Sequence, residues 1–302
     1  MKPHVRLAYS DFWGTFDPLH NYFAALLSPH YDLELADDPD FLLYSCFGKN
    51  FRRFPRATRI FYAGENARPN FRQCDFAFTF DHCDRPEHYR LPLYAWYGDP
   101  ASLVKGPVDA ERILAAKTGF CNFVYSNPRC KVRNRFFERL SKYKRVDSGG
   151  KWLNNIGGRV ENKREFLARY KFTIAFENDS HPGYTTEKIV EPMHVGSLPI
   201  YWGNPLVHLD FNPRSFVNYF DGGNLDDLVD RVVELDRNDR MYCDMLRQPW
   251  YHGNVVNQYV RPENVLAQFQ RIVAAGRATS ARPRLRPSIL PWRRRRSTRR
   301  AA

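Results

Sequence analysis

The chain has 302 residues, a formal net charge of +13, and a composition with 43% hydrophobic and 15% aromatic residues. This composition excludes a disordered polypeptide, the length allows two domains with separate cores, and the apolar runs are too short to span a bilayer. Ten arginines but no Asp, Glu or Lys lie within residues 277–302, so subtracting ten leaves +3 for residues 1–276, a balance that argues against a nucleic-acid-binding body.

The start of the chain and its cysteines indicate where the protein acts. The first residues, MKPHVRLAYSDFWG, lack the apolar core of a signal peptide. The six cysteines form no CxxC pair and no zinc spacing, and the nine histidines show no metal-ligand spacing. We therefore expect reduced, packed thiols in a cytoplasmic protein without a metal site.

The first part of the chain predicts one α/β unit. Strand-like apolar runs occur at residues 5–9, 42–45, 59–62 and 76–79, and helical periodicity follows near residues 108–117. Strands that alternate with helical segments are typical of parallel sheets. We place this unit in residues 1–118.

A second α/β unit is predicted for residues 119–276. We expect its strands at residues 122–126, 144–146, 170–176 and 197–203, and its helices at residues 134–143 and 163–170, after Thr185 or Thr186, after Asn224, and from Pro262 to Gly276. Two such units in succession predict paired Rossmann-like domains that face a central cleft. The last helix could pack back on the first unit, and residues 277–302 are expected to form an unstructured basic tail.

The segment ENDSHPGYTTEK, residues 177–188, follows one of these strands and begins a helix. Lys188 falls in the first helical turn, where the helix dipole disfavours a cation. A bound phosphate or diphosphate would explain that placement, because a helix N-terminus offers free N–H groups to anions. Asn178, Tyr184 and Glu187 would then lie at the same site, and Glu187 could accept hydrogen bonds from sugar hydroxyls. The alternative is an ordinary capped helix with a solvated Glu–Lys pair.

Two other segments carry candidate site residues. Arg133 and Arg135 stand at the start of a predicted helix, where a guanidinium suits a phosphate, although an exposed helix charge is an equal alternative. Glu65 follows a strand and a glycine in RIFYAGENARPNF, so its carboxylate could be a general base at the cleft or a turn cap. Ligands of open α/β sheets bind at the carboxyl ends of strands, which is where Glu65 and Asn178 both fall.

The run FTIAFENDSHPGYTTEKIVEPMHVGSLPIYWGNP, residues 172–205, resembles the donor-binding signature of the alpha-1,3-fucosyltransferase family, in particular its bacterial members. The resemblance continues in FNPRSFVN at 211–218, and upstream in FWG at 12–14, FYAGENARPNF at 61–71 and KVRNRFF at 131–137. The order FEN, GY, TEK and PIYWG is specific, so we prefer the family interpretation to the structural alternatives.

That resemblance implies a GT-B architecture, with an acceptor domain first and a GDP-fucose domain second. It also implies an inverting transfer from GDP-beta-L-fucose. We expect that no cofactor is required and that a divalent metal is at most stimulatory. By matching motifs, Glu65 takes the position of the general base, and Arg133 and Lys188 contact the diphosphate. The remaining donor-site residues that the resemblance implies are Asn178, Tyr184, Glu187 and Tyr62, with Glu187 counted beside Glu65 as catalytic.

The resemblance implies the acceptor and the biological role of the reaction less specifically. The family expectation is a galactosyl-N-acetylglucosamine glycan that receives fucose at O3 of the glucosamine, as in the decoration of lipopolysaccharide and other surface glycans. Transfer to O4 or to glucose stays open. His181-Pro182 stand where related sequences vary, so the contacts of that loop are not implied.

Two other interpretations remain open. One is another nucleotide-sugar transferase of the same fold with a different donor. The other is a basic RNA- or membrane-binding protein without catalysis, against which the nearly neutral body argues. The tail RPSILPWRRRRSTRR could hold an enzyme on the anionic inner face of the cytoplasmic membrane, or could be merely solvated.

Overall fold

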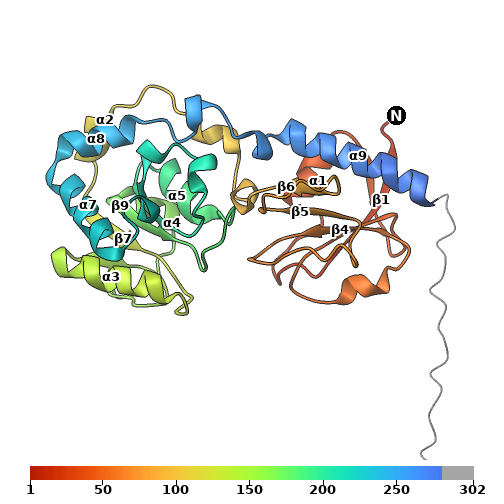
Figure 1. The fold of residues 1–302 in the computed structure, drawn as a ribbon, viewed down its shortest axis with the longest axis horizontal. Coiled ribbons are helices and arrows are strands. Elements are labelled where there is room, and N and C mark those ends of the chain that lie inside the picture. Colours follow the sequence, from red (N-terminus) through yellow and green to blue (C-terminus); the bar gives the residue numbers. More distant parts are fainter. Residues whose placement is uncertain (281–302) are drawn as a thin grey trace, which may run out of the picture.

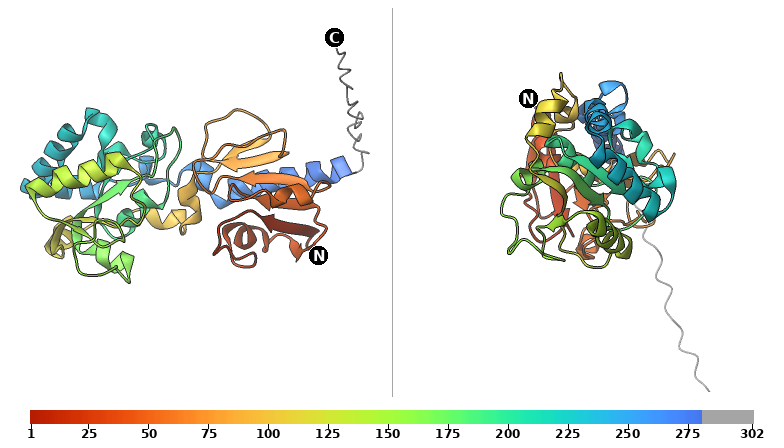
Figure 2. Two further views of the ribbon diagram at one scale, coloured as in Figure 1. Left: turned by 90° about the horizontal axis from the view of Figure 1, so that it is seen from below. Right: turned by 90° about the vertical axis from the view of Figure 1, so that its left-hand side faces the viewer.

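A computed structural model describes residues 1–280 and shows two α/β lobes that lie side by side (Figure 1). The chain leaves the first lobe after its sixth strand, builds the second lobe, and returns to the first lobe in its last helix. Seen from below, the two lobes remain distinct, and this helix runs along the first lobe (Figure 2). Residues 281–302, which hold most of the arginine-rich tail, lie outside the described residues. The predictions that this tail is unstructured and that it could bind an anionic membrane fall there.

The first lobe is built on a six-stranded parallel sheet in the order β2-β1-β3-β4-β5-β6. Its strands are β1 (His4–Ser10), β2 (Asp32–Leu35), β3 (Phe41–Tyr44), β4 (Thr58–Tyr62), β5 (Phe76–Thr79) and β6 (His88–Arg90). β3 is buried along its whole length, as expected for a parallel strand covered on both faces. The four strands predicted here are confirmed, whereas the edge strands β2 and β6 escape prediction because they are short and half polar.

The second lobe holds a five-stranded parallel sheet in the order β11-β10-β9-β7-β8. Its strands are β7 (Gly119–Phe123), β8 (Val146–Ser148), β9 (Tyr170–Phe176), β10 (Leu198–Trp202) and β11 (Val217–Asn218). The predicted positions of β7 and β8 are wrong by three and two residues. Pairing with β9 decides the register, since Gly119 lies opposite Tyr170 and Cys121 opposite Phe172. The residues after Phe123 therefore form a loop.

Helices connect these strands, and every predicted helix is present. They are α1 (Tyr22–Leu27), α2 (Ala110–Ala115), α3 (Lys131–Tyr143), α4 (Lys163–Ala168), α5 (Glu187–His194), α6 (Tyr219–Gly222), α7 (Leu225–Arg237), α8 (Asp239–Arg247) and α9 (Pro262–Ser280). Thr186, rather than Thr185, caps α5, and Asn224 caps α7 as predicted. Among residues 1–280, no helix is long and apolar enough to cross a membrane.

Helix α9 completes the core of the first lobe, although it follows the second lobe in sequence. The ring of Phe269 stacks on Phe78 with centroids 4.8 Å apart and meets Phe23 at 5.3 Å. The prediction that Gly276 ends this helix is wrong, because the helix continues to Ser280. A Cβ at position 276 would lie only 2.6 Å from the Phe41 ring, so this glycine serves close packing instead of helix termination.

A buried ion pair ties the two lobes together. Arg90, at the end of β6, donates through both Nη atoms to the two carboxylate oxygens of Asp210, each at 2.8 Å. The two side chains are 4% and 0% exposed. The Asn257 amide donates a further bond to Asp210 Oδ1 at 3.0 Å. These contacts fix how the carboxyl ends of the two sheets face each other.

Candidate active site

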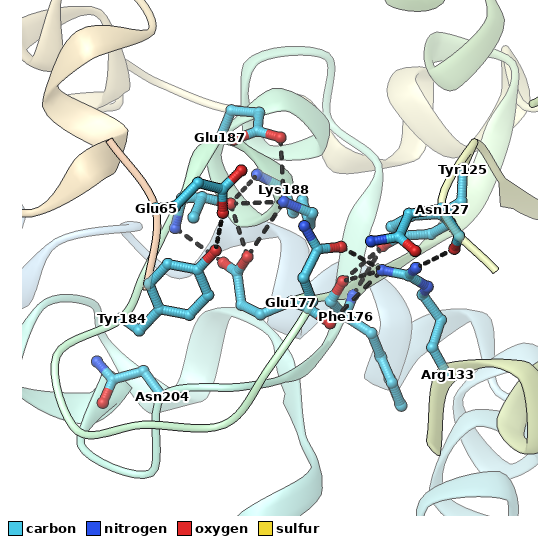
Figure 3. Close-up of polar contacts among 12 residues, drawn as sticks. Glu65, Tyr125, Asn127, Arg133, Phe176, Glu177, Tyr184, Glu187, Lys188 and Asn204 are labelled. Carbon is cyan, nitrogen blue, oxygen red and sulfur yellow. Dashed lines mark hydrogen bonds and ion pairs between the residues drawn. The ribbon is translucent and has the colours of Figure 1, made fainter. Parts of the chain in front are cut away.

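Two loops from different lobes meet where the carboxyl ends of the strands face each other. Glu65 lies in the loop after β4, and Tyr184 lies in the loop between β9 and α5. The Tyr184 hydroxyl donates a hydrogen bond to Oε2 of Glu65 at 3.1 Å (Figure 3). Tyr184 is buried, whereas Glu65 is exposed. The structure therefore brings the predicted base carboxylate against the predicted donor loop.

Arg133 lies in the first turn of α3, and its side chain is fully buried. Its Nη atoms donate to Oδ1 of Asn178 at 3.1 Å and to the carbonyl oxygen of Asn127 at 2.6 Å. The guanidinium also lies 3.9 Å from the ring centre of Tyr125. Within the described part of the chain, its Nε has no hydrogen-bond partner and the side chain forms no ion pair. Because a buried charge without a counter-ion is costly, an anion beside Arg133 would be stabilised.

Lys188, in the first turn of α5, has two carboxylate partners. Its Nζ lies 3.3 Å from Oε2 of Glu177 and 3.1 Å from Oε1 of Glu187 (Figure 3). Burial alone would lower the pKa of Lys188, but the two carboxylates outweigh burial and raise that pKa well above its ordinary value. The protein thus supplies a counter-charge itself, which differs from the expectation that a bound anion explains this lysine.

The carboxyl groups around Lys188 are not equivalent. Burial raises the pKa of Glu177 and of Glu191. Burial would also raise the pKa of Glu187, but the ammonium groups of Lys188 and Lys163 outweigh burial and lower that pKa. Glu187 is therefore an ionised hydrogen-bond acceptor at neutral pH. This character suits the predicted contact with sugar hydroxyls.

Glu177 is the site residue that sequence analysis missed. It is fully buried, and it accepts hydrogen bonds from the backbone N–H of Thr186 at 2.8 Å and from the Thr186 hydroxyl at 2.7 Å. Glu177 therefore fixes the start of α5 and the position of Lys188. The available signal was a carboxylate immediately after a mostly buried strand, a position from which the side chain can reach the N-terminus of the next helix.

Asn204 fixes the loop between β9 and α5 through two hydrogen bonds. Sequence analysis gave this residue no role either. Its Oδ1 accepts from the backbone N–H of Gly183 at 2.7 Å, and its Nδ2 donates to Thr185 Oγ1 at 2.9 Å. Gly183 has φ +86°, and a Cβ there would lie 2.2 Å from the backbone oxygen of Phe80. Only glycine lets the loop approach the first lobe so closely.

A cavity of about 250 Å³ opens beside these residues at the carboxyl ends of β7 and β9. Of the predicted donor-site residues, Asn178, Glu187 and Lys188 line it, whereas Arg133 and Tyr184 do not. Other polar lining residues are Tyr125, Ser126 and Asn127 of the loop after β7, Lys163 of α4 and Glu191 of α5. A larger cavity of about 590 Å³ lies at the β11 edge of the same sheet, and none of the predicted site residues lines it. The smaller cavity is therefore the candidate nucleotide site.

Two sequence-based candidates lie elsewhere. Tyr62 is 2% exposed, and its ring packs against Trp96 at 5.0 Å and Phe23 at 5.4 Å in the core of the first lobe. This burial argues against the donor contact that the resemblance implies for Tyr62. Arg135 is exposed, so Arg133 alone of the two arginines turns inward. Residues 1–280 contain no group of three or more His, Cys, Asp or Glu side chains placed to hold a metal ion.

Comparison with protein families identifies relatives along most of the chain. Residues 7–97 match the N-terminal domain of the alpha-(1,3)-fucosyltransferase FucT, and residues 114–270 match the C-terminal domain of glycosyltransferase family 10, the fucosyltransferases. The second match alone covers more than half of the chain. This protein belongs to glycosyltransferase family 10. The family prediction is thus confirmed, and the second match extends into α9, which packs on the first lobe.

Individual members of the fucosyltransferase family support this assignment. The alpha-(1,3)-fucosyltransferase FucT of Helicobacter pylori is 34% identical over an alignment of 287 residues that covers 81% of this chain and 60% of that protein. The chain thus spans about three-fifths of that relative's length. A putative fucosyltransferase of Acanthamoeba polyphaga mimivirus is 34% identical over 152 residues, 46% of this chain and 25% of that protein.

Solved structures confirm the GT-B fold. A crystal structure of an alpha1,3-fucosyltransferase superposes with a TM-score of 0.80 at 31% identity, and covers 90% of this chain and 91% of its own. The structure of an alpha1,3-fucosyltransferase with GDP-fucose superposes over the same shares with a TM-score of 0.76. HepE of Anabaena, solved with UDP-glucose, shares only the fold, with a TM-score of 0.52 at 10% identity.

Proposed function

We propose that this protein transfers L-fucose from GDP-beta-L-fucose to a sugar hydroxyl with inversion at the anomeric carbon. The observation that carries the proposal is the hydrogen bond between Tyr184 of the donor loop and Glu65 of the opposite lobe, in a chain of family 10. It joins a carboxylate of the first lobe to the loop that leads into α5, and Glu187 and Lys188 at the start of that helix line the cavity. A structure of a related fucosyltransferase with GDP-fucose supports the choice of donor.

The proposed reaction is a single in-line displacement. The acceptor oxygen attacks the anomeric carbon of fucose, and its proton passes to the Glu65 carboxylate. The bond from that carbon to the diphosphate oxygen breaks, and GDP leaves with the electron pair. A positioned base typically supplies roughly 10²–10⁴-fold of the rate.

The second lobe stabilises the leaving group in this mechanism. Arg133 and Lys188 face the charge that develops on the diphosphate, and the positive end of the α5 helix dipole adds to their attraction. Glu187 accepts hydrogen bonds from hydroxyls of the donor sugar, and Asn178, which Arg133 holds in place, orients the donor. No step assigned to these residues uses a metal, so we expect full activity in excess chelator.

We propose a galactosyl-N-acetylglucosamine glycan as the acceptor, with fucose joined alpha-1,3 to the glucosamine as part of a bacterial surface glycan such as lipopolysaccharide. The name of the Helicobacter pylori relative supports the linkage. We further propose that the reaction takes place in the cytoplasm, at the inner face of the membrane.

Product analysis tests the proposal directly. The purified full chain is supplied with GDP-fucose, GDP-mannose or UDP-sugars, and with galactosyl-N-acetylglucosamine, lactose or N-acetylglucosamine. We expect transfer from GDP-fucose alone, and a product whose NMR spectrum shows an alpha-fucosyl residue at O3 of the glucosamine. Transfer from another donor would replace the fucose assignment, and an O4 or glucose linkage would replace the acceptor assignment.

A further inference from the structure

Two segments on opposite sides of the active site are joined by more than the bond between Tyr184 and Glu65. We call residues 63–70, which carry Glu65, the base loop, and residues 177–184, which carry Tyr184, the donor loop. The amide of Asn66 in the base loop donates to Oδ2 of Asp179 in the donor loop at 2.7 Å. A carboxylate between the two loops makes further contacts with both.

That carboxylate belongs to Asp81, which lies just after β5 in the first lobe and is 17% exposed. Its Oδ1 lies 2.8 Å from Nε of Arg68 in the base loop, and 3.4 Å from Nε2 of His181 in the donor loop. Its Oδ2 accepts a hydrogen bond from the Thr79 hydroxyl at 2.7 Å. Asp81 therefore has one oxygen anchored to its own strand and the other shared between the two loops.

The neighbouring residue Phe80 reinforces the same junction. Its ring lies 4.7 Å from the Arg68 guanidinium and 5.1 Å from the Tyr184 ring. The Arg68 guanidinium also donates to Oδ1 of Asn66 at 3.1 Å, so the base loop is linked to itself as well as to Asp81. These contacts surround Glu65, which is exposed and has little packing to hold its loop in place.

We infer that Asp81 is a positioning residue, which sets the base loop relative to the donor loop through Arg68 and His181. This inference rests on the proposed function, because it concerns the geometry between Glu65 and the donor. Asp81 touches no reacting atom in this arrangement. A displacement of about 1 Å between reacting groups can cost about 10²-fold in rate, so a side chain that fixes two loops can control turnover from a distance.

Steady-state kinetics of Asp81→Asn test the role, with Asp84→Asn as the matched control. Asp84 lies in the loop between β5 and β6 that also carries Asp81, is exposed, and forms no hydrogen bond or ion pair with the described residues. We expect Asp81→Asn to lower kcat at least tenfold, while KM for the donor and Kd for GDP change less than threefold. Asp84→Asn should match the wild-type protein. Equal kcat in the two variants would overturn the inference, and so would a loss of GDP affinity as large as the loss of kcat.

A double variant tests whether the contact across the lobes matters. If Asp81 acts through His181, Asp81→Asn combined with His181→Ala should be no slower than Asp81→Asn alone, because contacts within one network are not additive. Losses that multiply would mean that the two residues act separately, and would refute the link between the lobes.

Hydrogen exchange separates this inference from the choice of substrate. We expect the backbone amides of residues 178–184 to exchange faster in Asp81→Asn than in wild type or Asp84→Asn, with no substrate present. That result is independent of which sugar the enzyme transfers. Unchanged exchange in Asp81→Asn would contradict the positioning role even if fucose transfer is established.

Discussion

At the scale of single residues, Arg133 and Lys188 show two ways of burying a cation beside one cavity. Lys188 rests between two carboxylates, whereas Arg133 is held by neutral oxygens and the ring of Tyr125. The attraction of Lys188 for an entering diphosphate is therefore partly offset by the protein's own charges, and that of Arg133 is not. We expect Arg133 to contribute the larger share of the affinity for the nucleotide.

Glu65→Gln should separate chemistry from binding. The amide keeps the shape of the side chain and can still accept from Tyr184, but it cannot take up the acceptor proton. We expect kcat to fall about 10²–10⁴-fold while Kd for GDP stays within a few-fold. Glu138→Gln, an exposed carboxylate on α3, is the control and should keep full activity. Near-wild-type turnover of Glu65→Gln would show that another group is the base.

Lys188→Met should weaken GDP binding and make stability depend on pH. Glu177 would then be buried without its ammonium partner, so its pKa, already raised by burial, should rise further. A carboxyl whose pKa is higher in the folded state favours folding at low pH and loses that contribution as pH rises through the folded-state pKa. Tm should therefore fall further below wild type at about pH 8 than at about pH 5. Lys151→Met, which removes an exposed lysine, is the control. If Tm of Lys188→Met lies equally far below that of the control at both pH values, this charge balance is wrong.

At the scale of elements, the loop between β9 and α5 depends on residues distant in sequence. Glu177 binds the start of α5 from the strand side, Asn204 supports Gly183 from beyond β10, and Phe80 covers the loop from the first lobe. The helix N-terminus that faces the cavity is thus positioned by the first residue of this loop, Glu177, and by two segments distant in sequence. The capping side chain of Thr186 determines only at which residue the helix begins.

Gly183→Ala should disturb this loop more than its backbone angle alone predicts. The new Cβ would need space now occupied by the backbone oxygen of Phe80, in addition to the strain of a positive φ. Gly157→Ala is a matched control, since Gly157 has φ +84° and no atom within 4 Å of a built Cβ. We expect Gly183→Ala to lose at least tenfold in kcat and Gly157→Ala to lose little. Similar kinetics for the two variants would show that the loop adapts.

At the scale of the whole molecule, the Arg90–Asp210 pair fixes one lobe on the other. Both groups are buried, the guanidinium binds both carboxylate oxygens, and the Tyr259 ring lies 4.8 Å from the guanidinium. A bidentate pair also sets an angle, whereas an apolar contact would allow the lobes to slide. The distance between Glu65 and the cavity of the second lobe depends on that angle.

Arg90→Met should destabilise the protein by about 3–5 kcal/mol, because it leaves the Asp210 carboxylate buried with Asn257 as its main remaining donor. The double variant Arg90→Met/Asp210→Leu should recover part of that loss. Arg139→Met breaks the exposed pair with Asp226 and should cost less than about 1 kcal/mol. Urea denaturation measures all three. A double variant less stable than Arg90→Met would mean that the carboxylate itself stabilises the junction.

Much of this fold could be predicted because local patterns and tertiary packing agree. The strand predicted at residues 170–176 is present and mostly buried. The helix predicted after Asn224 is present, and Asn224 caps it. The exceptions lie where packing overrides the local pattern. The strands β7 and β8 shift to match β9, and Gly276 is used for contact with Phe41 instead of ending a helix. Edge strands such as β2 have no local signal strong enough to detect.

The residue types and their order by themselves determined the family and the two α/β units. They also identified Glu65, Arg133 and Lys188 as candidate site residues, because charged side chains near strand ends and helix starts can be recognised in the sequence. Only the tertiary structure decided the partners of those side chains. It paired Lys188 with Glu177, buried Tyr62 in the core, and set Asp81 between the two loops. These outcomes depend on distances between segments far apart in the chain, which hydrophobic periodicity does not encode.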